Sequence, residues 1–128
     1  MHEFSAACSI VEAAVAAAEK HNAKTVTAVN IEIGQFTFLI PDQLKFNFDI
    51  ASKDTILEDA ELIITMKNGR IRCSDCGLES EAQSVPELPD QLAMFRPMKC
   101  SNCGSSATTI TSGKEFIITN IEAEIART

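Results

Sequence analysis

The chain has 128 residues, which suits one ordinary domain or two small ones that share a core. Hydrophobic residues make up 45% of it and charged residues 23%, which indicates a globular protein and not a disordered one. The formal net charge of −7 counts against a nucleic-acid partner, because nonspecific binding needs basic side chains to neutralise phosphates.

The first segment with clear periodicity is residues 4–21, which is rich in Ala and predicts a helix. Its expected polar face carries Glu12, Glu19 and Lys20, and Ser5 is a candidate N-cap. The buried face is expected to hold Ile10, Ala14, Ala17 and Ala18. Because Glu12 interrupts the apolar run, the segment does not resemble a secretory signal. No apolar run approaches the roughly 20 residues of a membrane span, so a cytoplasmic location is predicted.

The next segments alternate between strand and helix patterns. Residues 25–34 show the period-2 alternation of a half-buried strand that ends at Gly34. Pro41 suits the first turn of a second helix over about 41–53, whose apolar face would hold Leu44 and Phe48 and be widened by Phe46 and Ile50. Residues 60–68 and 114–126 return to alternation and predict two further strands.

The segment 70–113 differs in composition from the rest of the chain. It holds four of the five Cys and three of the four Pro, with few residues that could build a core. We therefore expect two domains: residues 1–69 with 114–128 as an α/β domain, and 70–113 as a small inserted module. The predicted fold class is α+β, with two helices on a small three-stranded sheet and an inserted zinc-ribbon-like module of two CxxC knuckles.

Two knuckles, "RCSDCG" at 72–77 and "KCSNCG" at 99–104, give the strongest local signal. Zn²⁺ prefers four tetrahedral ligands, and two C-x-x-C turns can supply them as thiolates. The predicted ligands are Cys73, Cys76, Cys100 and Cys103. Two disulfides or a thioredoxin-like redox pair are weaker alternatives. Four thiolates leave no open position, so the zinc would be structural, and its removal would unfold the module locally. Cys8 stands apart and is expected to be a buried core thiol.

The start of the chain, "MHEFS", has its own metal chemistry if the α-amine is free. The amine of Met1 and the amide and imidazole of His2 can chelate one metal ion through fused small rings. The amide of Glu3 would complete a four-nitrogen set, which suits tetragonal or square-planar Ni(II) or Cu(II). The simpler alternative is a solvated terminal histidine.

Taken together, "MHEFS", residues 29–49, the paired knuckles and "GKEFIITNIEAEI" at 113–125 resemble the HypA/HybF family of hydrogenase maturation nickel chaperones. The resemblance implies a nickel domain that binds Ni(II) through Met1, His2 and Glu3, and a separate zinc domain held by the four Cys. It also implies no enzymatic activity. The cargo would pass to the [NiFe]-hydrogenase large-subunit precursor with the help of a HypB-type GTPase, some relatives also supply urease, and a homodimer is a further possibility.

Two other functions compete with a nickel chaperone. A zinc-ribbon nucleic-acid module would need a basic face around the knuckles, and this chain is acidic. A protein-interaction module with an inert N-terminus is the second alternative. An enzyme is least expected, since the sequence has no Gly-rich phosphate loop and no Ser/His/Asp-type constellation. The segment 85–97 between the knuckles is long and Pro-rich, and is expected to be a loop.

Overall fold

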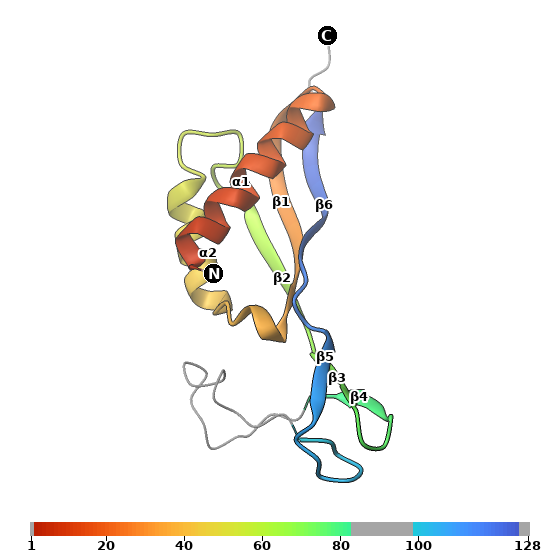
Figure 1. Cartoon of the computed structure of the whole chain (residues 1–128). Helices are drawn as coiled ribbons and strands as arrows, with labels where there is room; N and C mark the ends of the chain where they lie inside the picture. Colours follow the sequence, from red (N-terminus) through yellow and green to blue (C-terminus); the bar gives the residue numbers. More distant parts are fainter. Residues whose placement is uncertain (1, 83–98, 126–128) are drawn as a thin grey trace. The chain divides into compact units, whose positions relative to one another are not determined.

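The computed structural model describes residues 2–82 and 99–125 (Figure 1). These residues divide into two compact units. The first unit comprises residues 2–32, 39–65 and 116–125, and the second comprises 33–38, 66–82 and 99–115. The predicted inter-knuckle loop at 85–97 lies outside the described residues. Among the residues that are described, neither helix is long and apolar enough to cross a bilayer.

The first helix, α1 (Glu3–Lys20), confirms the prediction of a helix at the start of the chain. Its buried face includes Ile10, Ala14 and Ala18, while Ala17 is half-buried. The prediction that Ser5 caps this helix is wrong. His2 occupies the N-cap with extended backbone angles, and its carbonyl accepts the amide of Ala6 at 2.9 Å.

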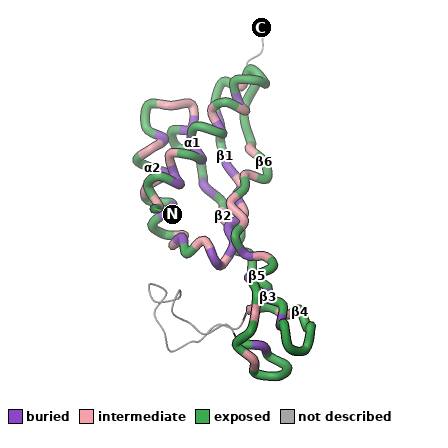
Figure 2. The backbone as a smooth tube through the Cα atoms, viewed as in Figure 1, coloured by how far each residue is buried: buried purple, intermediate pink, exposed green. Residues whose placement is uncertain are grey.

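The predicted sheet of three strands is present, in the order β2-β1-β6. Its strands are β1 (Ala23–Gly34), β2 (Glu61–Lys67) and β6 (Phe116–Ile125). Figure 2 shows that burial concentrates in the central strand β1, as its position between two neighbours requires. Side chains join β1 to β6: Thr27 donates to the Glu122 carbonyl at 3.1 Å, and Thr119 donates to the Asn30 carbonyl at 3.1 Å. Residue numbers that rise in one strand and fall in the other make this pair antiparallel.

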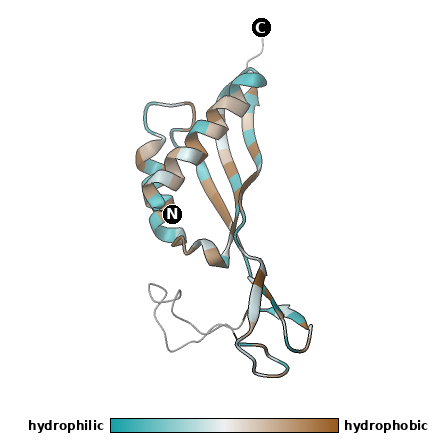
Figure 3. Ribbon diagram, in the orientation of Figure 1, coloured by the Kyte–Doolittle hydropathy of each residue, from teal (hydrophilic) through white to brown (hydrophobic). Residues whose placement is uncertain are grey.

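A short 3₁₀ turn, η1 (Gln35–Thr37), separates β1 from α2 (Pro41–Ala51), where Pro begins the helix as predicted. Leu44 and Phe48 are fully buried. The prediction that Phe46 and Ile50 widen this face is wrong, because their side chains are 66% and 45% exposed. At 100° per residue, a position two away from Phe48 lies on the opposite side of the helix. The hydropathy colouring in Figure 3 accordingly alternates along both helices.

The second unit contains a sheet of its own, in the order β4-β3-β5, which the sequence did not predict. Its strands are β3 (Arg70–Cys73), β4 (Glu79–Glu81) and β5 (Thr108–Ser112). The central strand β3 pairs antiparallel with both neighbours, so that Ile71 lies opposite Ser80 and Ile110. Ile71 is 1% exposed, which gives this small unit a buried apolar centre next to the cysteines.

Residues 33–38 also contribute to the second unit. The amide of Phe36 donates to the Gly113 carbonyl at 2.7 Å, and the Gln35 side chain accepts the Gly69 amide at 2.8 Å. The Phe36 ring lies so close to both glycines that a Cβ atom at either would overlap it. These contacts bring a segment from the end of β1 together with the two chain stretches that flank the cysteines.

Candidate metal centres

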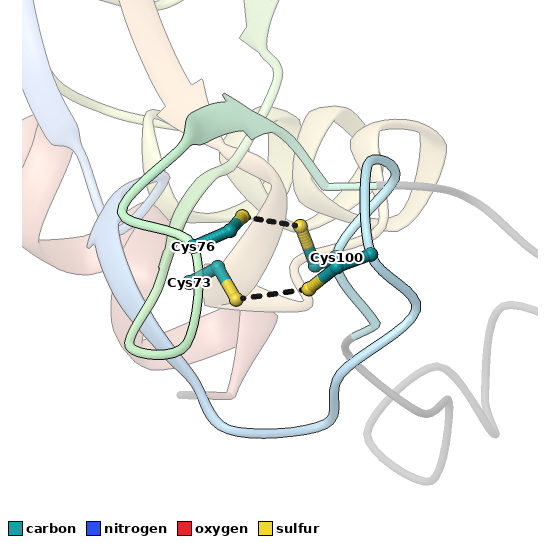
Figure 4. Close-up of side chains that lie close together, drawn as sticks. Cys73, Cys76 and Cys100 are labelled. Carbon is teal, nitrogen blue, oxygen red and sulfur yellow. Dashed lines mark hydrogen bonds between the residues drawn. The ribbon is translucent and has the colours of Figure 1, made fainter.

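Four cysteines come together in the second unit, as the knuckle spacing predicted. The sulfurs of Cys73, Cys76, Cys100 and Cys103 all lie within 4.8 Å of one another. Cys73 and Cys103 are 3.5 Å apart at Sγ, and Cys76 and Cys100 are 3.6 Å apart. Figure 4 shows the Cys76 and Cys100 sulfurs facing each other across this cluster.

This sulfur arrangement fits a zinc ion. Zn–S bonds of about 2.3 Å in a tetrahedron place the sulfurs roughly 3.8 Å apart. The Cys73–Cys103 and Cys76–Cys100 sulfur distances, 3.5 and 3.6 Å, are close to that value. None of the five cysteines forms a disulfide in the structure. A bound zinc would take all four thiolates and supply a structural crosslink between the two knuckles.

Both knuckles fold in the same way. In the first, the amide of Gly77 donates to the Cys73 carbonyl at 2.9 Å, and in the second Gly104 donates to Cys100 at the same distance. Both glycines have φ of +76°, a left-handed conformation that L side chains rarely adopt. Gly at this position therefore lets the chain turn back after the second cysteine of each knuckle.

The pKa values of three of the four cysteines are shifted, and not all in the same direction. Backbone amides of Cys103 and Asn102 lower the pKa of Cys100 to about 6. The Ser105 amide acts in the same direction on Cys103, but neighbouring sulfurs and burial outweigh it and raise the pKa of Cys103 to about 12. The amide of Cys76, and more weakly that of Asp75, lower the pKa of Cys73. Four close thiols cannot all ionise on their own, so a divalent cation is the group that this donor set requires.

Exposure differs between the two positions of each knuckle. The first cysteines, Cys73 and Cys100, are buried, whereas the second ones, Cys76 and Cys103, are exposed. Cys8 does not belong to this cluster. It is half-buried on α1, so the expectation of a buried core thiol is wrong, and it stands on the edge of the helix's packed face.

Of the three predicted nickel ligands, the structure describes His2 and Glu3, whereas Met1 lies outside the described residues. His2 is exposed at the N-cap of α1. Glu3 is the first helical residue and is half-buried, and its carboxylate accepts the amide of Ile40 at 3.4 Å. Ile40 is the N-cap of α2, so Glu3 connects the starts of the two helices, a contact across 37 positions that the sequence did not reveal. His21, the other histidine, is exposed at the far end of α1, as expected.

Comparison with known proteins places these features in a family. Residues 1–123 match the family model described as "Hydrogenase/urease nickel incorporation, metallochaperone, hypA". The chain is 38% identical over 125 residues to the hydrogenase maturation factor HypA of Methanothermobacter thermautotrophicus, covering 97% of this chain and 98% of that one. It is also 38% identical to HypA of Chlorobium phaeobacteroides, covering 97% and 100% of the two chains.

Solved structures support the same fold. The solution structure of the Ni metallochaperone HypA from Helicobacter pylori aligns with a TM-score of 0.65 at 21% identity, covering 98% of this chain and all of that one. A second solution structure of a HypA protein aligns with a TM-score of 0.64 and covers 96% of both chains. The resemblance read from the sequence is confirmed: this chain belongs to the HypA family of nickel-incorporation metallochaperones, which are not enzymes.

Proposed function

We propose that this chain binds Ni(II) at its N-terminus and delivers it during the maturation of [NiFe]-hydrogenase. The ligands are the Met1 amine, the amide and imidazole of His2, and the backbone amide of Glu3. The observation that carries the proposal is the place of His2, which is exposed at the N-cap of α1. An exposed N-cap leaves the imidazole free to turn toward a metal ion next to the α-amine.

The position of Glu3 supports a role for its amide and not its carboxylate. The first four amides of an α-helix have no partner within the helix, and Glu3 is the first residue of α1. Its amide nitrogen is therefore available to the metal. Its carboxylate instead accepts the Ile40 amide at 3.4 Å, which holds the backbone of Glu3 against the start of α2. Nickel would bind to a terminus that is anchored only one residue after its imidazole ligand.

Ni(II) titration of the untagged protein tests this site, with the absorption bands of planar Ni(II) as the readout. Replacement of His2 by Ala should abolish the bands, and so should one extra residue before Met1, because it moves the free amine away. The matched control is His21→Ala, which removes the other exposed histidine at the opposite end of the same helix. Nickel binding that survives His2→Ala would favour a protein-interaction module with an inert N-terminus.

We further propose that Cys73, Cys76, Cys100 and Cys103 hold one structural zinc ion, with residues 70–113 as the zinc domain and 1–69 with 114–128 as the nickel domain. The support is the cluster of four sulfurs within 4.8 Å. Metal analysis of the purified protein should find about one zinc per chain. A single Cys→Ser variant, for example at Cys73, should reduce zinc retention without affecting Ni(II) binding at the N-terminus.

The delivery step rests on the family and on relatives that are named hydrogenase maturation factors. The proposed partners are a HypB-type GTPase and the [NiFe]-hydrogenase large-subunit precursor. Cells that lack their own nickel chaperone should recover hydrogenase activity with this chain but not with the His2→Ala variant. Equal recovery of hydrogenase activity with the parent and the His2→Ala variant would mean that the protein's role in maturation does not depend on nickel binding at His2.

A further inference from the structure

The two knuckles have the same backbone turn but differ in their side chains at two pairs of positions. "CSDCGL" at 73–78 aligns with "CSNCGS" at 100–105, so that Asp75 corresponds to Asn102 and Leu78 corresponds to Ser105. Each knuckle turns through a glycine with φ of +76°. Because the backbone turns match, these side chains are the differences within the knuckles themselves.

One side of the site carries a hydrogen bond between the knuckles. The Ser105 hydroxyl donates to the Asp75 carboxylate, and it accepts the Ala107 amide at 3.0 Å. Backbone bonds support the same connection: Ser74 donates to the Ala107 carbonyl and Cys100 donates to the Ser105 carbonyl, both at 2.8 Å. The segment that follows the second knuckle is thereby fixed to the interior of the first.

This connection reaches one particular pair of sulfurs. The amide of Asp75 is hydrogen-bonded to the Cys73 sulfur, and the amide of Ser105 is hydrogen-bonded to the Cys103 sulfur. Those two sulfurs are 3.5 Å apart. Asp75, Ser105 and the two cysteines therefore form a closed ring of contacts around one edge of the metal site.

The opposite edge, between Cys76 and Cys100, has only half of this arrangement. The amide of Asn102 donates to the Cys100 sulfur at 3.4 Å, as its position in the knuckle requires. Its counterpart across the site is Leu78, whose side chain has no hydrogen-bonding group and is 42% exposed. The bond that joins Asp75 to Ser105 cannot form here. Cys76 and Cys103 are both exposed, so the two cysteines differ in how firmly their neighbours are held and not in accessibility.

We propose that the Asp75–Ser105 hydrogen bond makes the zinc site asymmetric: it holds Cys103 on the metal and leaves Cys76 as the thiolate that dissociates first and reacts first with electrophiles. The inference rests on the proposed zinc site. Asp75 and Ser105 are positioning residues, since they act on the metal only through the cysteines. Hydrogen-bond partners of metal ligands change affinity or activity by about 10- to 100-fold in proteins, so the expected effect is large enough to measure.

The test uses zinc-loaded full-length protein treated with a limiting amount of iodoacetamide. The thiolate sulfur attacks the iodoacetamide methylene carbon, a C–S bond forms, and iodide leaves with the electrons of the C–I bond. Tandem mass spectrometry then gives the modified fraction of each cysteine. We expect Cys76 to react about tenfold faster than Cys103. The half-buried Cys8 lies outside the cluster and serves as an internal reference.

Variants assign the asymmetry to the hydrogen bond. Ser105→Ala should raise the reactivity of Cys103 toward that of Cys76 and speed zinc release to a chelator about tenfold. Ser105→Thr keeps the hydroxyl and should restore the parent's order. The matched control is Thr111→Ala, which removes a hydroxyl that donates to Glu79 at 2.7 Å in the same sheet. This control should leave the order of modification unchanged.

The second test adds the missing hydrogen bond to the opposite edge, and it still tests the proposal if the Ser105→Ala variant fails to retain zinc. The double variant Leu78→Ser with Asn102→Asp builds the missing bond on the other edge, and Cys76 should then react as slowly as Cys103. Equal rates for the two cysteines in the parent, or an order that none of these variants changes, would overturn the proposal. Zinc content is measured first: parent protein without zinc would refute the zinc site itself, whereas zinc with equal rates refutes only the asymmetry.

Discussion

Two phenylalanines on α2 allow a sharp prediction about the core. Phe48 is fully buried, whereas Phe46, two positions earlier on the same helix, is 66% exposed. A Phe side chain buries roughly 200 Å² at most, so the two sites differ by roughly 130 Å² of buried area. At about 25 cal/mol per Å², Phe48→Ala should lower the free energy of unfolding by about 3 kcal/mol more than Phe46→Ala. The change in helix propensity is the same in both variants and cancels.

Urea denaturation of the zinc-loaded protein, followed by far-UV circular dichroism at the helix band, measures this difference. The signal reports chiefly on α1 and α2, which both belong to the first unit. The Phe46→Ala variant is the matched control for handling, expression and chain entropy. Equal losses of stability in the two variants, or a larger loss for Phe46→Ala, would refute the burial argument and with it the assignment of the inner face of α2.

Three further predictions concern the second unit. Gly69→Ala should lower the free energy of unfolding by about 1–3 kcal/mol, because the new Cβ would lie 2.6 Å from Cζ of Phe36. Phe36→Leu should recover part of that loss in a double-mutant cycle, whereas additive losses in the two variants would contradict the overlap. Removal of zinc by a chelator should expose four thiols to a thiol reagent and broaden the amide NMR signals of β3 and β5, while those of α1 stay sharp; unchanged β3 and β5 signals would argue against a folding role for the metal. Zinc affinity should rise with pH, because zinc binding displaces the proton of Cys103, whose pKa is raised to about 12. Below pH 6 the affinity should fall more steeply, because Cys100, whose pKa is lowered to about 6, then also takes up a proton. Competition titrations at several pH values would show this, and a flat profile would count against it.

The metal cluster could be predicted from the sequence because its geometry is largely local. Two cysteines three positions apart, followed by a glycine that permits positive φ, already fix half of the ligands. The link from Asp75 to Ser105 spans 30 positions and depends on which segments pair in three dimensions. No local pattern distinguishes these two residues from the many other polar residues around the knuckles.

The helices were easier to predict than the faces they bury. The periodicity of α2 is real, but apolar residues occur on both of its sides, and only packing against α1 decides that Phe48 is buried and Phe46 is not. The strand β5 was missed for a related reason. Its sequence, "TTITS", does not alternate clearly in polarity, and its extended form depends on pairing with β3.

Phe36 bears on how the cysteine-bearing part of the molecule can be exchanged between relatives. Its ring lies against Gly69 and Gly113, at the two ends of that part, and comes from a different stretch of chain. A chimera that exchanged only residues 70–113 would therefore combine the insert with a residue at position 36 from another protein, although the glycines at its ends pack against that side chain. A chimera should therefore exchange the aromatic residue at position 36 together with the glycines at 69 and 113, because these three positions, although distant in the sequence, depend on one another.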